Sequence, residues 1–330
     1  MSTNGGAPLM TQFLLAIEGG GTKTRLLLAD AAGDILAREI GGPASGLYIS
    51  RGVYAREMGT LLRRVERIAK ANGGRVTTVG LGGPMDGPLV EGAVQRVFGK
   101  VRLIRVGESE IAFALHGVDW GVSLVAGTGA SCRAHTPEGL AIGCGGFGPQ
   151  FGDEGSGYWI GRAAISAAMR AGDKRGPETA LTARLCAFYG LSRVLDILRF
   201  VDKSGHVSGT KVASCVPQVF AAANAGDAIA NGICHEAGLA LGRLVIATAH
   251  NVKWSRAPIP LVLTGGVFNG GTLILKPLRR ALRGSRVAFH MYPVTPEPTE
   301  GIVKIILRAI AGADVRARNS ELRRQRHVSG

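Results

Sequence analysis

The sequence has few cysteines, no long apolar run and little acidic charge, and each scarcity argues against a class of protein. Its five cysteines are scattered and include no Cys-x-x-Cys pair, which argues against a disulfide framework and a zinc site. No stretch approaches the length of a membrane span, and the first twelve residues lack the basic and apolar segments of a signal peptide. We therefore expect a cytoplasmic protein with reduced thiols and no membrane partner.

Basic residues outnumber acidic ones by 39 to 24, which gives a formal net charge of +15. Such a charge attracts polyanions, but no nucleic-acid-binding module and no interleaving of aromatic with basic residues accompanies it. We therefore expect a solvated basic surface and no nucleic-acid partner. Part of the charge lies in a carboxyl-terminal tail that carries Arg316, Arg318, Arg323, Arg324 and Arg326.

The features that are present favour a two-domain α/β protein. A chain of 330 residues is too long for one compact core, and its 50 glycines suit strands joined by tight turns. Apolar runs at residues 13–17 and 25–29 flank a glycine-rich turn and predict a β-hairpin. Residues 122–126 and 131–135 repeat this pattern around a second turn, which predicts a weak internal duplication.

The other predicted elements alternate between strand and helix, as in sheets covered by crossover helices. They are strands at 35–40, 76–81, 101–106, 259–264 and 286–291, helices at 53–71 and 108–115, a mainly helical region at 157–252, and helices after 272 and 298. The expected organisation is a flexible amino terminus (1–12), a first lobe (13–117), a second lobe with a helical insertion (118–312) and a basic tail (313–330).

The turn of the first hairpin, Glu-Gly-Gly-Gly-Thr-Lys-Thr at residues 18–24, has the composition of a phosphate site. Glycines let backbone N–H groups approach an anion, and the hydroxyl and ammonium groups add donors. The turn is not a P-loop, because GxxxxGK[ST] is absent and a strand, not a helix, follows. Gly-Thr-Gly at residues 127–129 forms a matching turn, so we predict that the two turns bind the phosphates of one nucleotide from both sides.

Two further glycine-rich segments suggest binding sites. Residues 143–161 place the adjacent carboxylates of Asp153 and Glu154 just ahead of a predicted helix. These carboxylates can cap the helix, or Asp153 can bind sugar hydroxyls, and both interpretations stay open. Residues 261–270 form a predicted strand that runs into Gly265 and Gly266, where an adenine ring can lie against bare backbone.

In this order, the four segments resemble those of the BadF/BadG/BcrA/BcrD ATPase family, and within it the N-acetylglucosamine kinases of the sugar kinase, Hsp70 and actin superfamily. The resemblance covers Leu14 to Ala311 and is most specific at residues 143–161. It implies an α/β fold of two actin-like (ribonuclease H-like) lobes, each a mixed sheet flanked by helices, with a nucleotide cleft between them. It also implies a kinase that uses ATP and Mg²⁺ to phosphorylate an amino sugar, namely N-acetylglucosamine or glucosamine, and it leaves a homodimer open.

The resemblance assigns roles to individual residues. The implied phosphate contacts are Gly20, Gly21, Thr22, Lys23, Gly127, Thr128 and Gly129, and the implied adenosine contacts are Gly265, Gly266 and Asn269. Glu18 stands where the superfamily has a carboxylate that holds Mg²⁺ through water. The implied sugar pocket comprises Ser45, Ala130, Ser131, Gly145, Gly146, Phe147 and Asp153.

The chain departs from the family at the catalytic base. These kinases usually carry an aspartate after the strand that ends here at Val106, whereas this chain has Gly107 and then Glu108. Glutamate offers the same carboxylate on a longer side chain, so Glu108 is the predicted base that deprotonates the sugar hydroxyl. Ser45 and Ser131 stand where the relatives have asparagine, so the identity of the sugar stays open.

Two other interpretations of the resemblance stay open. Some family members are ATPases that drive electron transfer into a partner dehydratase or reductase and bind an iron-sulfur cluster through cysteines. Cys132 and Cys144 are the nearest candidates for such ligands. Glu108, Ser45 and the basic tail also suit a sugar-sensing pseudokinase without turnover.

Overall fold

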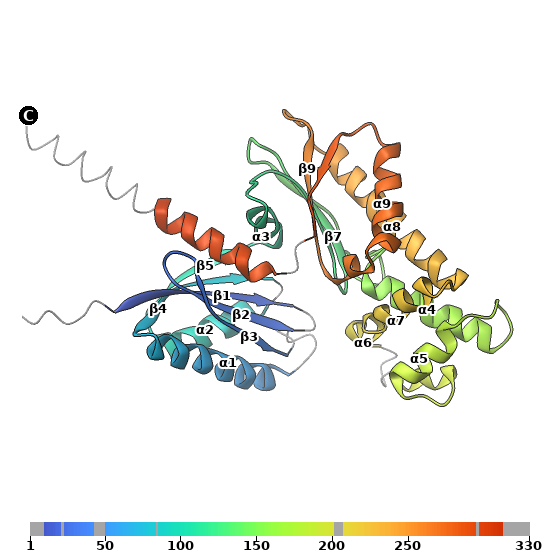
Figure 1. Ribbon diagram of the computed structural model, residues 1–330, viewed down its shortest axis with the longest axis horizontal. Helices are drawn as coiled ribbons and strands as arrows, with labels where there is room; N and C mark the ends of the chain where they lie inside the picture. Colours follow the sequence, from blue (N-terminus) through green and yellow to red (C-terminus); the bar gives the residue numbers. More distant parts are fainter. Residues whose placement is uncertain are drawn as a thin grey trace, which may run out of the picture. The chain divides into compact units, whose positions relative to one another are not determined.

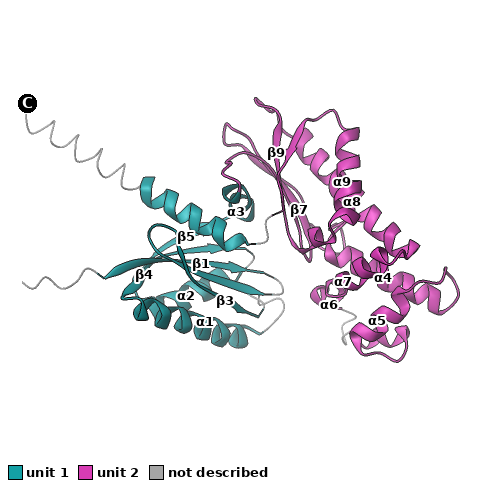
Figure 2. Cartoon of the chain, viewed as in Figure 1, with its two compact units in different colours: residues 1–115, 297–330 teal, residues 116–296 magenta. Residues whose placement is uncertain are grey.

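The computed structural model describes residues 10–20, 23–42, 50–83, 85–200, 207–294 and 297–312. The chain divides into two compact units (Figure 2). Unit 1 comprises residues 1–115 and 297–330, and unit 2 comprises residues 116–296. The predicted second lobe extended to residue 312, and this boundary is wrong. The helix over residues 298–312 belongs to unit 1, because its Ile302, Val303 and Ile306 are buried in the core of that unit.

Unit 1 is built on one mixed sheet with the strand order β3-β2-β1-β4-β5. Its strands are β1 (Thr11–Gly19), β2 (Thr24–Ala29), β3 (Ile35–Gly41), β4 (Gly74–Gly82) and β5 (Arg102–Val106). The first three strands form antiparallel pairs, and β1, β4 and β5 run parallel to one another. The predicted first hairpin is therefore confirmed as β1 and β2.

Helices cover both faces of this sheet. Helices α1 (Arg51–Ala71) and α2 (Gly87–Phe98) lie on one face, and α3 (Glu108–Leu115) and the helix over 298–312 lie on the other (Figure 1). Alternate residues of a strand point to opposite faces, so Leu15 and Ile17 pack toward α1 while Leu14 and Ala16 pack toward residues 298–312. Strand β1 is buried on both sides, which explains its unbroken apolar run.

The sheet of unit 2 repeats the topology of unit 1, with the strand order β10-β9-β6-β7-β8. Its strands are β6 (Gly121–Ala126), β7 (Ala130–His135), β8 (Ala141–Gly145), β9 (Ile259–Thr264) and β10 (Phe289–Met291). Strands β6, β7 and β8 form antiparallel pairs, and β6, β9 and β10 are parallel. Strand β6 thus corresponds to β1 and β9 to β4, as the predicted duplication requires.

Helices make up most of the rest of unit 2. They are α4 (Gly157–Gly172), α5 (Leu181–Tyr189), α6 (Gly209–Ala213), α7 (Val216–Asn224), α8 (Ala228–His250), α9 (Thr272–Gly284) and the 3₁₀ helices η1 (Val194–Phe200) and η2 (Gly266–Gly270). Helix α8 packs on β6, β7 and β8, and α9 packs along α8. Within the described ranges, none of the helices combines the length and apolar character needed to traverse a lipid bilayer.

Candidate active site

In each unit, the candidate residues gather where parallel strands end. In unit 1, Glu18, Gly83 and Glu108 stand at or just after the carboxyl ends of β1, β4 and β5. The carboxyl ends of parallel strands meet at one edge of a sheet, which is where α/β proteins bind ligands. In unit 2, the turn after β6 and the glycine pair after β9 share the corresponding edge.

The first glycine-rich turn closes the β1–β2 hairpin. The Gly20 N–H donates to the Lys23 carbonyl oxygen at 2.9 Å, and Lys23 is exposed. Gly83 adopts φ +84° after β4, and a Cβ there would lie 2.2 Å from the Gly19 carbonyl oxygen. Only glycine fits at that contact, so β4 supports the turn from the side. The predicted phosphate residues Gly21 and Thr22 lie outside the described residues, as does Ser45.

Glu18 has two differently engaged carboxylate oxygens. Its Oε2 accepts a hydrogen bond from Arg25 Nη1 at 2.7 Å, whereas Oε1 lies 3.8 Å from the position that a Cβ would take at Gly20. Burial raises the pKa of Glu18, and the Arg25 guanidinium opposes that rise. Mg²⁺ is usually held by one or two carboxylates together with substrate phosphates and water, so one oxygen facing the turn fits that ion.

Glu108 and Glu110 lie on the same first turn of α3 but have different surroundings. Glu110 Oε2 accepts the Gly107 N–H at 2.8 Å and so satisfies one of the free donors at the helix start. Glu108 is exposed at the carboxyl edge of the sheet. Glu110 therefore has a capping role, and the position of Glu108 suits the predicted base.

The second glycine-threonine turn is held by the start of α4. The Gly127 N–H donates to the Gly129 carbonyl oxygen at 2.9 Å, which closes the turn. The Gly157 and Tyr158 N–H groups of α4 donate to the carbonyl oxygens of Gly127 and Thr128 at 2.8 and 3.0 Å. A Cβ at Gly157 would lie 2.9 Å from the Gly127 oxygen, so the helix can approach this closely only with glycine there.

The glycine pair after β9 packs directly against this second turn. Gly265 adopts φ +110°, and a Cβ there would lie 2.3 Å from the Ala126 carbonyl oxygen. No atom lies within 4 Å of the position that a Cβ would take at Gly266, and both Gly266 and Asn269 are exposed. The structure therefore brings two of the predicted nucleotide segments together in unit 2.

Asp153 lies beside the same turn. Its side chain is buried, and Oδ2 lies 2.8 Å from the position that a Cβ would take at Gly129. Burial raises the pKa of Asp153, while the backbone N–H groups of Ala130 and Gly148 oppose that rise. Among the described residues, Asp153 Oδ1 has no hydrogen-bond partner. A buried carboxylate with one unsatisfied oxygen is suited to bind the hydroxyl groups of a ligand.

The alternative that Asp153 caps α4 is wrong. Ser156 is the N-cap residue, and its Oγ accepts the Trp159 N–H at 3.1 Å. Asp153 instead contributes its carbonyl oxygen, which accepts the Ser156 N–H at 3.0 Å. Its carboxylate is thereby left for other partners.

The remaining predicted sugar residues come from the ends of β7 and β8. Ser131 pairs with Gly145 across the two strands, and Ala130 is buried at the start of β7. Gly145 and Gly146 adopt φ +70° and +74°, and a Cβ at Gly146 would lie 3.1 Å from that of Ser131. Phe147 is 71% exposed. This part of the predicted pocket is contiguous with the second turn through Ala130.

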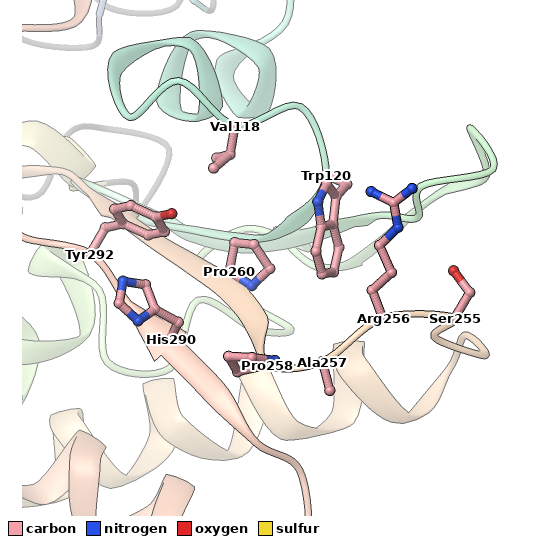
Figure 3. A pocket seen from close by; sticks show the side chains of 9 residues that line it. All are labelled: Val118, Trp120, Ser255, Arg256, Ala257, Pro258, Pro260, His290 and Tyr292. Atoms are coloured by element: carbon pink, nitrogen blue, oxygen red, sulfur yellow. The ribbon is translucent and has the colours of Figure 1, made fainter.

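An open hollow of about 730 Å³ in unit 2 does not coincide with these residues (Figure 3). Its walls include Trp120, Pro258 and Tyr292, around the starts of β6 and β9 and the end of β10. The second turn follows the opposite end of β6. The hollow is therefore not part of the candidate site.

Gly83 and Gly157 were missed at the sequence level. The internal duplication carries a signal for Gly83, because the pair Gly82-Gly83 ends β4 as Gly265-Gly266 follows β9. Gly157 lies in the segment where the resemblance is most specific, but no role was predicted for it. Its importance depends on α4 docking onto the second turn, a contact between segments thirty residues apart in the chain.

Comparison with known proteins gives the chain a family context. The family model for the BadF/BadG/BcrA/BcrD ATPase family matches residues 15–295. An N-acetylmuramic acid/N-acetylglucosamine kinase from Clostridium acetobutylicum is 27% identical, with 82% of this chain and 90% of the relative aligned. An N-acetyl-D-glucosamine kinase from Dictyostelium discoideum is 26% identical, with 90% of this chain and 98% of the relative aligned.

The fold has solved counterparts. A proposed N-acetylglucosamine kinase from Porphyromonas gingivalis matches with a TM-score of 0.70 at 19% identity, covering 89% of this chain and 99% of that structure. A glucokinase from Streptomyces griseus matches with a TM-score of 0.54 at 17% identity, covering 88% of this chain and 97% of that structure. At these identities the likeness concerns the fold, and it confirms the predicted actin-like α/β architecture of two mixed sheets flanked by helices.

Proposed function

This chain belongs to the BadF/BadG/BcrA/BcrD ATPase family, and from that membership we propose that it is an ATP-dependent kinase of an amino sugar. Both curated relatives are named as kinases that act on N-acetylglucosamine, so this sugar is the proposed acceptor. The observation that carries the proposal is the buried carboxylate of Asp153. It lies against the second glycine-threonine turn with one oxygen unsatisfied among the described residues.

The proposed reaction transfers the γ-phosphoryl group of ATP to a sugar hydroxyl. The hydroxyl oxygen attacks the γ-phosphorus, the bond to the β–γ bridging oxygen breaks, and the hydroxyl proton passes to the Glu108 carboxylate. Backbone N–H groups of the glycine-threonine turns and the Lys23 ammonium bind the phosphates. Mg²⁺, when bound, offsets charge on the phosphate oxygens, and the Glu18 oxygen that faces Gly20 would hold it through water.

In this proposal, Asp153 orients the sugar. An ionised carboxylate accepts hydrogen bonds from two adjacent hydroxyls, and such charge-assisted bonds are stronger than neutral ones. Gly145 and Gly146 place bare backbone close to Ser131, so this backbone can line the proposed sugar pocket. The exposed Gly266 and Asn269 provide the proposed adenosine surface.

The test is ADP release from MgATP with a panel of N-acetylglucosamine, glucosamine, N-acetylmuramic acid, N-acetylmannosamine and glucose. We expect stimulation by N-acetylglucosamine, and a fall in kcat of about 10²- to 10⁴-fold in Glu108→Gln, since a general base contributes that much. Glu110→Gln is the matched control, because its amide oxygen can still accept the Gly107 N–H. If no sugar stimulates ADP release while ATP still binds, the kinase proposal is wrong.

A further inference from the structure

Two thiols in unit 2 face each other across neighbouring strands. Cys132 of β7 and Cys144 of β8 are directly opposite partners in the antiparallel register. Directly opposite residues in an antiparallel pair project their side chains to the same face of the sheet. Both cysteines are free thiols.

Contacts with the carboxyl end of α8 agree with this orientation. Asn251 Nδ2 donates to Cys144 Sγ at 3.2 Å. The Thr248 side chain opposes the rise that burial causes in the pKa of Cys132, so it too lies near that sulfur. Thr248 and Asn251 are three residues apart and so lie on the same side of the helix end. Both sulfurs therefore point into the same interface between the sheet and α8.

The geometry points to a reversible disulfide, and we propose that Cys132 and Cys144 are a redox pair. Directly opposite residues of antiparallel strands have Cα atoms about 4.5 or 5.5 Å apart. Disulfides span Cα separations of about 4.4 to 6.8 Å. Both Cα separations fall within this range, and the Cβ atoms of the two cysteines need to approach to about 3.5–4.5 Å for the bond to form.

The two thiols have different accessibility, which sets the order of the chemistry. Cys144 is half-buried, whereas Cys132 is fully buried, and burial raises the pKa of its thiol to about 12. With hydrogen peroxide as the oxidant, the Cys144 sulfur attacks one peroxide oxygen, the O–O bond breaks, and Cys144 becomes a sulfenic acid with release of water. The Cys132 sulfur then attacks the Cys144 sulfur and gives up its proton. The S–O bond breaks, and the second water leaves with the disulfide formed.

The position of the pair connects this bond to the candidate site. Ser131 and Gly145, both predicted sugar residues, immediately adjoin the two cysteines. Forming the bond withdraws Cys144 Sγ from Asn251 and ties β8 to β7 at the base of the loop that carries Asp153. Resting on the proposed kinase function, we expect oxidation to lower sugar-dependent turnover about tenfold or more, because small displacements of substrate-positioning groups cost that much. A dithiol reductant restores the activity.

Tryptic peptide mapping tests the bond independently of any activity. Cleavage after Arg105, Arg133 and Arg162 places Cys132 in residues 106–133 and Cys144 in residues 134–162, with one cysteine in each peptide. Full-length protein is treated with hydrogen peroxide, alkylated and digested without reduction. The expected result is one species that joins both peptides with the loss of two hydrogen atoms and separates on reduction.

Variants distinguish a redox pair from incidental oxidation. In Cys132→Ala, the Cys144 sulfenic acid has no partner, so labelling by dimedone increases over the wild type. Cys186→Ser is the matched control, because Cys186 is also half-buried but belongs to α5, and we expect it to leave the cross-link unchanged. Thermal unfolding of each reduced variant establishes that it is folded.

Two results would overturn the redox pair. One is recovery of both peptides uncrosslinked after peroxide treatment that oxidises Cys186, and the other is equal dimedone labelling of Cys144 with and without Cys132. If the cross-link forms but turnover does not change, the effect on the site is refuted while the disulfide stands. If the reduced protein shows no kinase activity, only the proposed function fails, because the peptide map is unaffected.

Discussion

Asp153 is energetically unfavourable in two ways: in its backbone conformation and in the burial of its carboxylate. It adopts φ +62° in the left-handed region, which is unfavourable for a residue with a side chain, although aspartate tolerates it better than most. Its carboxylate is also buried, 7% exposed, with one oxygen unsatisfied among the described residues. Such costs concentrate at functional sites, where the strained group gains its partners on ligand binding.

We predict that Asp153→Asn stabilises the free protein at neutral pH while weakening sugar use. Asparagine also tolerates positive φ and removes the buried charge, so the free energy of unfolding at pH 7 rises by up to about 1 kcal/mol. Loss of charge-assisted hydrogen bonds to the sugar lowers kcat/KM for the sugar about 10- to 100-fold, which corresponds to roughly 1.4–2.7 kcal/mol. Urea unfolding and steady-state kinetics measure the two effects.

The stabilisation depends on pH in a defined direction. Burial raises the pKa of Asp153 above its ordinary value of 3.8, so the folded state keeps a proton that the unfolded state has released. Protonated Asp153 therefore makes its whole contribution to the free energy of unfolding below about pH 4. This contribution is lost as the pH rises through the folded-state pKa of Asp153. The advantage of Asp153→Asn over the wild type must shrink from pH 7 to pH 4. Glu236→Gln, which removes an exposed carboxylate of α8, is the control, and an equal pH effect there would refute the assignment.

The residue scale also shows where inference from sequence ends. The run of glycines around Asp153 predicted a folded loop with two carboxylates, and this much could be read from composition. The contact of Asp153 with Gly129 depends on positive φ at Gly145, Gly146 and Gly148, which turn the loop back toward β7. Glycine adopts several conformations with similar energies, so its presence in the sequence does not specify which one is used.

At the scale of elements, the second turn and the start of α4 are held together by backbone hydrogen bonds. Two N–H groups at the start of the helix, which usually lack partners, bind carbonyl oxygens of the turn. The helix therefore holds the turn in place through contacts between backbone atoms.

We predict that Gly157→Ala disturbs the contact between α4 and the second turn. The new Cβ would lie 2.9 Å from the Gly127 carbonyl oxygen and 3.3 Å from the Ala213 Cβ, so backbone must shift. Overpacking of this kind costs about 1–3 kcal/mol of stability, and displacement of the turn raises KM for ATP more than KM for the sugar. Steady-state kinetics with each substrate varied in turn measures the difference.

The matched control is Gly232→Ala in α8. Gly232 is exposed, and no atom lies within 4 Å of the position that its Cβ would take. Alanine there stabilises a helix by up to about 1 kcal/mol and should not change either KM. If Gly157→Ala raises both KM values equally, or neither, the turn does not depend on α4 in this way.

Elements with strong periodic patterns were predicted closely, and the others were not. The β9 strand and α3 match their predicted ranges, because apolar runs and helical spacing define them. No element was predicted at α2 or β8. Helix α2 contains Gly87, Pro88 and Gly92, which lower its helical propensity, and it depends on the Asp86 cap and on packing of Val90 and Val94 against α1. Strand β8 alternates with glycine and is specified by its pairing with β7.

At the scale of the whole molecule, the chain passes from unit 1 to unit 2 and returns. The helix over residues 298–312 contributes Ile302, Val303 and Ile306 to the core of unit 1, where they pack with Leu14 and Leu27. The predicted boundary missed this return because an amphipathic helix does not indicate which sheet it covers. The core of unit 1 therefore depends on residues from both ends of the described chain.

Because each unit has its own core, we predict that a core substitution in one unit lowers the stability of that unit and not of the other. Ile302 in unit 1 and Ile274 of α9 in unit 2 are both fully buried isoleucines in helices, so they form a matched pair. Replacing either with alanine removes the same atoms and costs about 2–5 kcal/mol, but in different cores.

Fluorescence separates the two responses, because all three tryptophans, Trp120, Trp159 and Trp254, belong to unit 2. In urea unfolding, Ile302→Ala should lower the midpoint seen by far-ultraviolet circular dichroism, which reports both units, and leave the tryptophan transition close to that of the wild type. Ile274→Ala should shift the tryptophan transition itself. If Ile302→Ala shifts both signals together, the two units unfold in a single cooperative transition. The division at residues 115 and 296 then separates two compact units that do not unfold independently.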